Sequence, residues 1–192
     1  LKKKEYDKAL EDVQSIEKMG GSVKPEFIAK LKNRDSFPEK NLETEKPSEK
    51  YPGASSEVNL YNSRGYDSFK SGRYNEAIAD CNRALAIDPN DTLMLANRAN
   101  AYGAQGKLNE AIADFKKVLE IDPKDYKVCH DLGLTYADMR DYNNALYYFN
   151  KVFEINPATE NDGQFHNDRG VAYFFLKDYD RCWEDVNKAI EL

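Results

Sequence analysis

The sequence lacks the features that mark several common classes of protein. No run among its 192 residues approaches the roughly 18 consecutive apolar residues that a membrane-spanning helix needs. Basic residues are not in excess, because 28 Lys and Arg stand against 34 Asp and Glu. The resulting net charge of −6 disfavours binding to nucleic acid. We therefore expect neither a membrane span nor a DNA or RNA partner.

Residues suited to metal binding or catalysis are also scarce. The three cysteines, Cys81, Cys129 and Cys182, form no CxxC pair, and their odd number argues against a disulfide framework. Neither of the two histidines, His130 and His166, has a Cys or carboxylate partner at metal-ligand spacing. Phosphate-binding glycine loops, GxSxG and HExxH are missing. We expect no catalytic residue, no cofactor and no metal, and the chain is not expected to be an enzyme.

A repeat of 34 residues organises most of the chain. Prolines recur with this spacing at Pro89, Pro123 and Pro157. Two further columns keep the same period, and they are filled by Ala77, Ala111 and Ala145 and by Gly65, Ala99 and Gly133. Three columns in one phase predict an array of equivalent structural units.

Each unit has the pattern of two short amphipathic helices. In the first unit we expect helices at 58–71 and 75–87, with a turn at Gly72-Arg73. Asp88-Pro89 should end the second helix, because proline lacks an N–H and restricts the residue before it. One such hairpin cannot bury its apolar faces alone, so the units must stack on one another.

The columns resemble the tetratricopeptide repeat family, and in particular bacterial proteins with many such repeats. The units are 58–91, 92–125, 126–159 and, after a three-residue insertion, 163–192. The resemblance covers residues 58–192. It implies an all-α fold, a right-handed superhelix or solenoid of stacked antiparallel helix pairs.

One column departs from the family pattern. Arg replaces the usual Leu at position 7 in three units, and Asp then stands at position 23, whereas the third unit has Leu132 and Tyr148. These positions are equidistant from the turn and should face each other in an antiparallel hairpin. We expect three structural ion pairs, Arg64–Asp80, Arg98–Asp114 and Arg169–Asp185, with independent solvated charges as the alternative.

The N-terminal part of the chain differs from the array. Residues 5–16 match residues 178–189, so we expect them to form the second helix of a repeat whose first helix is missing. A capping-type helix should follow and end by residue 32. Residues 33–57 carry many charges and Pro38, Pro47 and Pro52, which is typical of a flexible linker. The chain therefore resembles a piece of a longer array, with an apolar helix face at each end. Either the two ends pack on each other, within one copy or between copies, or a boundary imposed on the sequence or a missing segment created both ends.

The family resemblance also implies a peptide groove lined by the first helix of each unit. The positions that line it carry these residues: Asn59, Asn62, Tyr66, Phe69, Lys70, Leu93, Ala96, Asn100, Lys127, His130, Leu134, Gln164, Asn167, Val171, Phe174 and Phe175. Amides can donate to and accept from a peptide backbone, and aromatic rings offer contact area. For Phe174 and Phe175 the alternative is packing beneath a lost neighbouring helix, one that this sequence does not contain.

These observations favour a non-enzymatic scaffold that binds a protein or peptide segment in the groove. One alternative is a self-assembly or regulatory module of a larger protein that acts through its exposed array ends, where copies can join into a homo-oligomer. Another is the repeat portion of an enzyme whose catalytic domain lies outside this sequence. A cytoplasmic location is favoured, but the sequence leaves localisation open.

Overall fold

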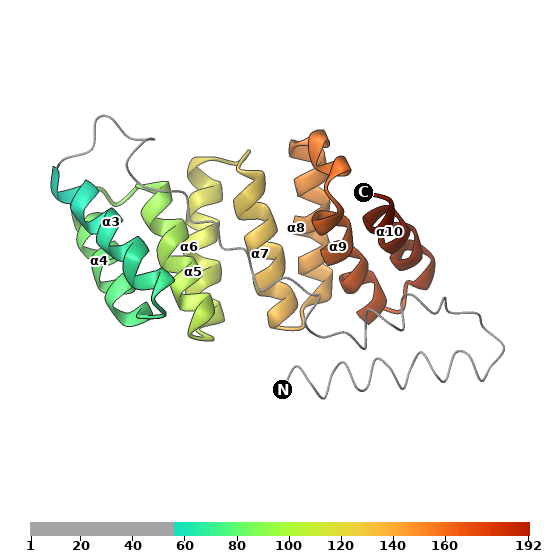
Figure 1. Cartoon of the computed structure of the whole chain (residues 1–192), viewed down its shortest axis with the longest axis horizontal. Coiled ribbons are helices and arrows are strands. Elements are labelled where there is room, and N and C mark those ends of the chain that lie inside the picture. The colour runs from blue at the N-terminus through green and yellow to red at the C-terminus, as the bar shows by residue number, and fades with distance from the viewer. Residues whose placement is uncertain (1–55) are drawn as a thin grey trace. The chain divides into compact units, whose positions relative to one another are not determined.

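The computed structural model describes residues 56–192, all within one compact unit. This part of the chain contains eight α-helices, one 3₁₀ helix and no strand (Figure 1). In chain order they are α3 (Ser56–Lys70), α4 (Tyr74–Ile87), α5 (Thr92–Ala104), α6 (Leu108–Ile121), α7 (Tyr126–Asp138), α8 (Tyr142–Ile155), η2 (Pro157–Asn161), α9 (Gly163–Phe175) and α10 (Tyr179–Glu191). The fold is all-α, as the repeat pattern predicts.

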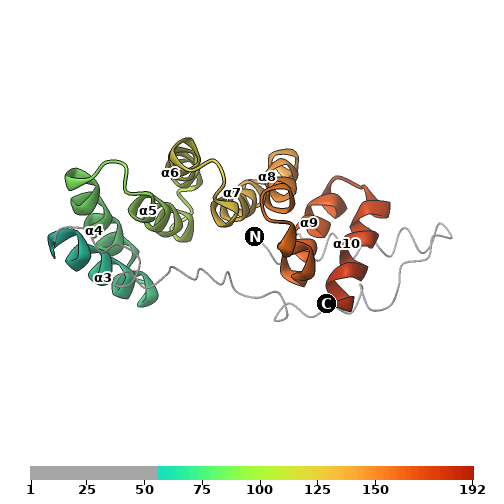
Figure 2. The same ribbon diagram turned by 90° about the horizontal axis from the view of Figure 1, so that it is seen from above.

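The α-helices form four antiparallel pairs, one for each expected unit. The pairs are α3 with α4, α5 with α6, α7 with α8, and α9 with α10. Each pair packs on the next through its second helix, so that α4 contacts α5, α6 contacts α7, and α8 contacts α9 (Figures 1 and 2). The described residues therefore form a superhelical solenoid of stacked helix pairs, which confirms the predicted fold class.

Proline and aspartate set the boundaries between units. Asp88 leaves the helical region with φ −126° and ψ 98°, as expected of a residue that precedes proline. Three residues later, the carboxylate of Asp91 caps α5 by accepting a hydrogen bond from the backbone N–H of Met94 at 3.1 Å. Asp125 caps α7 in the same way, through the N–H of Val128 at 3.0 Å. The repeat sequence thus ends one helix and begins the next within a few residues.

The turn within each unit needs one residue with positive φ. Glycine supplies it in the first two units, at Gly72 (φ 72°) and Gly106 (φ 75°). In the last two units Arg140 and Lys177 adopt φ 63° at the same repeat position. Glycine reaches this region at no steric cost, whereas other residues are uncommon there. The backbone of the turn is therefore conserved along the array even where its glycine is not.

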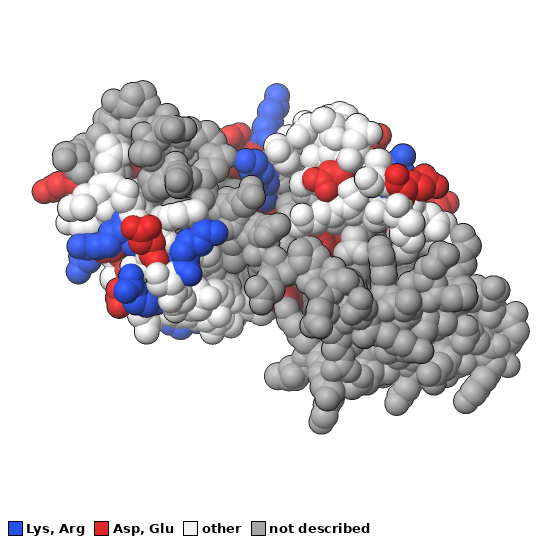
Figure 3. All heavy atoms as spheres, in the orientation of Figure 1, with Lys and Arg blue, Asp and Glu red and all other residues white. Residues whose placement is uncertain are grey.

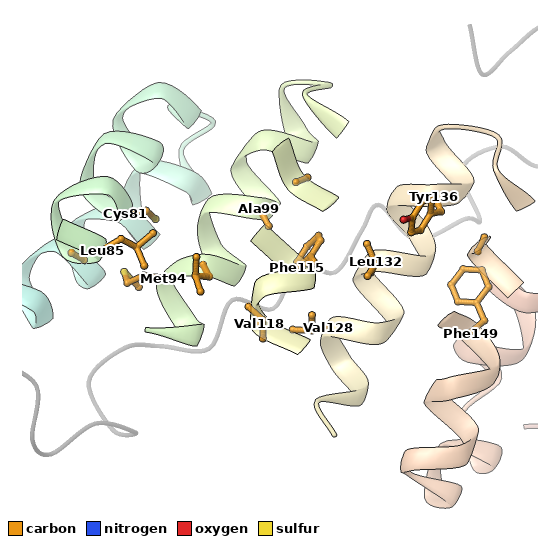
Figure 4. Close-up of a cluster of buried hydrophobic side chains, with 14 of the residues drawn as sticks. Cys81, Leu85, Met94, Ala99, Phe115, Val118, Val128, Leu132, Tyr136 and Phe149 are labelled. Atoms are coloured by element: carbon orange, nitrogen blue, oxygen red, sulfur yellow. The ribbon is translucent and has the colours of Figure 1, made fainter. Parts of the chain in front are cut away.

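The core runs continuously from one unit into the next (Figure 4). Phe115, Leu132 and Phe149 are among its most deeply buried side chains. Helices approach closely where a small residue stands at position 8, and a Cβ added to Gly133 would lie 2.6 Å from the ring of Phe149. The apolar columns seen in the sequence therefore become one shared core rather than four separate ones.

Two sequence predictions concern regions that the structure describes only in part or not at all. The proposed repeat helix at 5–16 and the capping-type helix that ends by residue 32 lie outside the described residues. Most of the proposed linker 33–57 lies outside them too, but α3 already begins at Ser56. The three-residue insertion before the fourth unit forms the end of η2 and the N-cap Asp162.

Candidate functional site

The structure brings each position-7 arginine together with its position-23 aspartate. The guanidinium of Arg98 donates from Nε and Nη2 to the two carboxylate oxygens of Asp114, both at 2.7 Å. Arg169 makes the same fork on Asp185, again with two contacts of 2.7 Å. In the first unit Arg64 contacts both oxygens of Asp80, and its hydrogen bond lowers the pKa of that carboxyl. These are two-point contacts between the helices of one unit.

The third unit replaces this ion pair with apolar and aromatic packing. Leu132 is fully buried, and Tyr148 packs against the same core cluster. The ring of Tyr148 stacks on that of Tyr136, with centroids 5.6 Å apart and planes 8° from parallel. The same pair of interhelical positions therefore holds an ion pair in three units and a packed leucine and tyrosine in the third unit.

The arginines also reach back to the preceding unit, a contact that the sequence analysis missed. Nη1 of Arg98 donates to Oδ1 of Asn82 on α4 at 2.6 Å. Nη1 of Arg169 donates to Oδ1 of Asn150 on α8 at 3.1 Å. Asn82 and Asn150 both stand at repeat position 25. Comparison of columns 7 and 25 between successive units would have revealed this pairing.

The first helices of the units carry the predicted groove residues, and two pairs of these helices, α3 with α5 and α7 with α9, are in contact. Most of the residues are half-buried, so they retain some accessible surface. This group comprises Asn59, Tyr66, Phe69, Leu93, Ala96, Asn100, Leu134, Gln164, Asn167, Val171 and Phe175. Lys70 and Lys127 are exposed, whereas Asn62, His130 and Phe174 are buried.

Asn62 is distinctive within this set. Its side chain is 3% exposed, and its Oδ1 is the one buried side-chain nitrogen or oxygen atom among residues 56–192 that lacks a hydrogen-bond partner. Leaving a buried acceptor unpaired costs about 1–3 kcal/mol. Asn100 and Asn167 add half-buried amides to the same set on α5 and α9.

The aromatic members of the set divide into accessible and internally packed rings. Tyr66 is half-buried, and the ammonium of Lys70 lies 5.7 Å from its ring centroid. Phe174 instead contacts Tyr179 of α10, with centroids 6.0 Å apart, and is buried. Phe175 stacks on Tyr142 of the preceding unit at 4.5 Å. These two phenylalanines therefore pack against helices of the array itself, and Phe174 offers little surface to a ligand.

The histidines have carboxylate partners that the sequence did not reveal. His130 donates from Nε2 to Asp168 of α9 at 2.8 Å and packs edge-on against Phe165. His166 contacts Asp185 through Nδ1 at 3.0 Å and the backbone oxygen of Glu160 through Nε2 at 3.1 Å. The insertion before the fourth unit changes the spacing between His130 and Asp168, whereas His166 and Asp185 stand at positions 4 and 23 of one unit. Both rings lie in structural contacts, and His130 links the third unit to the fourth.

The three cysteines are buried among the described helices. Burial raises the pKa of Cys81 and Cys182 to about 12 and that of Cys129 to about 11, so their thiols stay protonated at neutral pH. Within residues 56–192, no group of three His, Cys, Asp or Glu side chains could hold a metal ion. No helix in this part of the chain is long and apolar enough to cross a membrane.

Stacked hairpins of two helices, a 34-residue period and a shared core define a helical-repeat protein. Family models described as "Tetratricopeptide repeat" match residues 58–91, 93–125 and 126–159, which together exceed half of the chain. The chain belongs to the tetratricopeptide repeat family. Members of this family are generally non-catalytic scaffolds, and this chain is a protein–protein interaction scaffold.

Solved structures with the same fold include two described groups. The structure titled "MamA 41-end from Desulfovibrio magneticus RS-1" is 22% identical, with a TM-score of 0.65, and the match covers 71% of this chain and 75% of that one. The Sgt2 TPR domain from Aspergillus fumigatus is 28% identical, with a TM-score of 0.60, and the match covers 66% of this chain and 83% of that one. Among curated proteins, no sequence matches.

Proposed function

We propose that the scaffold binds an extended peptide segment of a partner protein along its first helices, α3, α5, α7 and α9. The observation that carries this proposal is the unpaired, buried Oδ1 of Asn62. A peptide N–H reaching this oxygen would remove the cost of the orphaned acceptor. The site would then use amide–backbone hydrogen bonds, which are largely independent of the peptide side chains.

Neighbouring residues fit the same ligand. Asn100 and Asn167 retain part of their surface and can each donate to and accept from a peptide unit. Tyr66 provides a half-buried ring one helical turn beyond Asn62, where it can contact a side chain of the ligand. Leu93, Ala96, Leu134 and Val171 add half-buried apolar surface between these polar groups. The set is neutral apart from Lys70 and Lys127, which favours an uncharged or mildly acidic segment.

Peptide selection followed by calorimetric titration tests the proposal. Peptides are selected against the full chain from a random library displayed on phage, and the affinity of the best one is measured by titration. Asn100→Ala combined with Asn167→Ala should weaken binding by roughly 2- to 10-fold for each hydrogen bond that the substitutions remove.

Asn109→Ala is the matched control, because Asn109 is an exposed amide on the second-helix side, in α6. The control should bind as tightly as the unmodified chain. A selected peptide whose affinity is unaffected by the double substitution, or is reduced equally by the control, would contradict binding along the first helices.

A further inference from the structure

The two ends of the array carry the two halves of the junction that joins its inner units. At the first two inner junctions the residue at position 3 of the first helix is covered, since Met94 and Val128 are 1% and 4% exposed, and at the third junction Phe165 is half-buried. The equivalent residue of the first unit, Leu60, is 58% exposed. The outer side of α3 and α4 therefore exposes a position that the preceding unit covers in the second and third units.

This N-terminal face is a pocket with mixed charge. A cavity of about 600 Å³ is lined by Leu60, Tyr61 and Arg64 from α3 and by Glu76, Asp80 and Arg83 from α4. Figure 3 shows basic and acidic side chains side by side at the end where α3 and α4 lie. Arg64 occupies the position from which Arg98 and Arg169 reach back to Asn82 and Asn150. The pocket thus has the arginine of a junction but no preceding second helix among the described residues.

The helix α10 carries the complementary half. Asn187 stands at position 25, as Asn82 and Asn150 do. At position 28 Ile190 corresponds to Leu85, Leu119 and Phe153, all apolar and at least half-buried, yet Ile190 is 47% exposed. The two side chains that a second helix uses at an arginine junction are therefore both present on the outer side of α10.

The junction between the second and third units lacks both the asparagine and the arginine, which supports the pairing of these two residue types. There the second helix carries Lys116 at position 25, and the following unit has Leu132 instead of arginine at position 7. Lys116 accordingly turns to the ring of Tyr136, with its ammonium 5.7 Å from the ring centroid. Arginine occurs where the preceding unit offers asparagine, and it is missing where the preceding unit offers lysine, which would repel it.

We infer that the N-terminal face of the array binds α10 of a second copy of the chain, head to tail, with Asn187 of one copy opposite Arg64 of the other. Residues 5–16 are the competing occupant from the same chain. Their repeat register places Gln14 at position 25 but Glu17 at position 28, where every inner junction has an apolar residue. The apolar Ile190 therefore favours α10. Because such a contact joins two different surfaces, each copy can bind one neighbour through α3 and α4 and another through α10, which permits chains or rings.

Mixing two end-blocked variants tests this arrangement with the full chain. Leu60→Glu should disable the N-terminal face, and Ile190→Glu should disable the outer side of α10. The unmodified chain should gain mass with concentration in sedimentation equilibrium, while each variant alone should remain monomeric at every concentration. An equimolar mixture of the two should form dimers and nothing larger, because exactly one functional junction remains.

Two further variants complete the test. Asn187→Lys should weaken association by about tenfold or more, because it places a positive charge opposite Arg64. Ile121→Glu is the matched control: Ile121 is 43% exposed but lies inside the array, so association should be unchanged. The inference is wrong if the unmodified chain stays monomeric, if either end-blocked variant assembles alone, or if their mixture stays monomeric. Circular dichroism confirms that each variant retains its helices.

Discussion

Arg98 stabilises two interfaces with one side chain. It donates to both carboxylate oxygens of Asp114 within its unit and to Asn82 in the preceding unit. Asp114 is buried, so the loss of its arginine would leave a carboxylate with no opposite charge in a poorly solvated position. The third unit shows how the chain avoids this cost, since it replaces both members of the pair together.

Arg98→Leu should therefore lower the free energy of unfolding by about 3 kcal/mol. The double variant Arg98→Leu with Asp114→Tyr should lose markedly less, although it removes more polar contacts. The new tyrosine would lie near Tyr102, which occupies the repeat position of Tyr136, and could stack there as Tyr148 stacks on Tyr136. Urea unfolding of the single and double variants decides the matter, and equal losses would refute the coupling.

The Arg–Asp pairs were predictable because their positions are equidistant from a turn whose place the sequence marks. The partner of His130 was not, because the insertion before the fourth unit changes the spacing of contacts across it. His166 and Asp185 lie in one unit, but position 4 holds a histidine only in that unit, so no repeated column marks the pair. The inward packing of Phe174 also escaped the sequence analysis. Its repeat position is typical of a groove, and only the path of α10 shows that Tyr179 covers it.

Within a helix pair, the closeness of approach differs between units at the same repeat position. Position 8 is glycine in three units and Ala99 in the second. At Gly133 an added Cβ would lie 2.6 Å from the buried ring of Phe149, whereas at Gly65 the nearest atom, Cβ of Asp80, would be 3.6 Å away. Of these two glycines, only Gly133 is required by the packing of its helices.

Two identical substitutions should therefore have opposite effects. Gly133→Ala should destabilise the fold by about 1–3 kcal/mol, because the ring of Phe149 must move in a packed core. Gly65→Ala should stabilise it by up to about 1 kcal/mol, since alanine loses less backbone entropy in a helix than glycine does. Thermal unfolding of the two variants compares them directly, and a stabilising Gly133→Ala would show that the two helices are not held at this distance.

The helix boundaries of the first unit were predicted to within two residues, since proline, aspartate and glycine mark them chemically. Its helices were expected at 58–71 and 75–87 and are observed as Ser56–Lys70 and Tyr74–Ile87. The turns at Arg140 and Lys177 show where such marking fails. There the surrounding hairpin imposes a positive φ on residues that do not favour it, and sequence alone gives no warning.

Across the whole array, stability and binding belong to different surfaces. The shared core and the junctions hold neighbouring units together, and each unit depends on those beside it. The first helices contribute to this core, but they also retain a half-buried set of amides and apolar groups. Substitutions in that set should therefore alter recognition more than stability, whereas substitutions at junctions should do the reverse.

Hydrogen–deuterium exchange of the full chain, with and without a peptide selected against it, tests the central proposal most directly. Binding along the first helices predicts that α3, α5, α7 and α9 gain protection when the peptide is added. The second helices α4, α6 and α8 should exchange as before, because they lie behind that surface in each pair. Protection confined to the second helices, or to the two end faces of the array, would contradict the proposed peptide site.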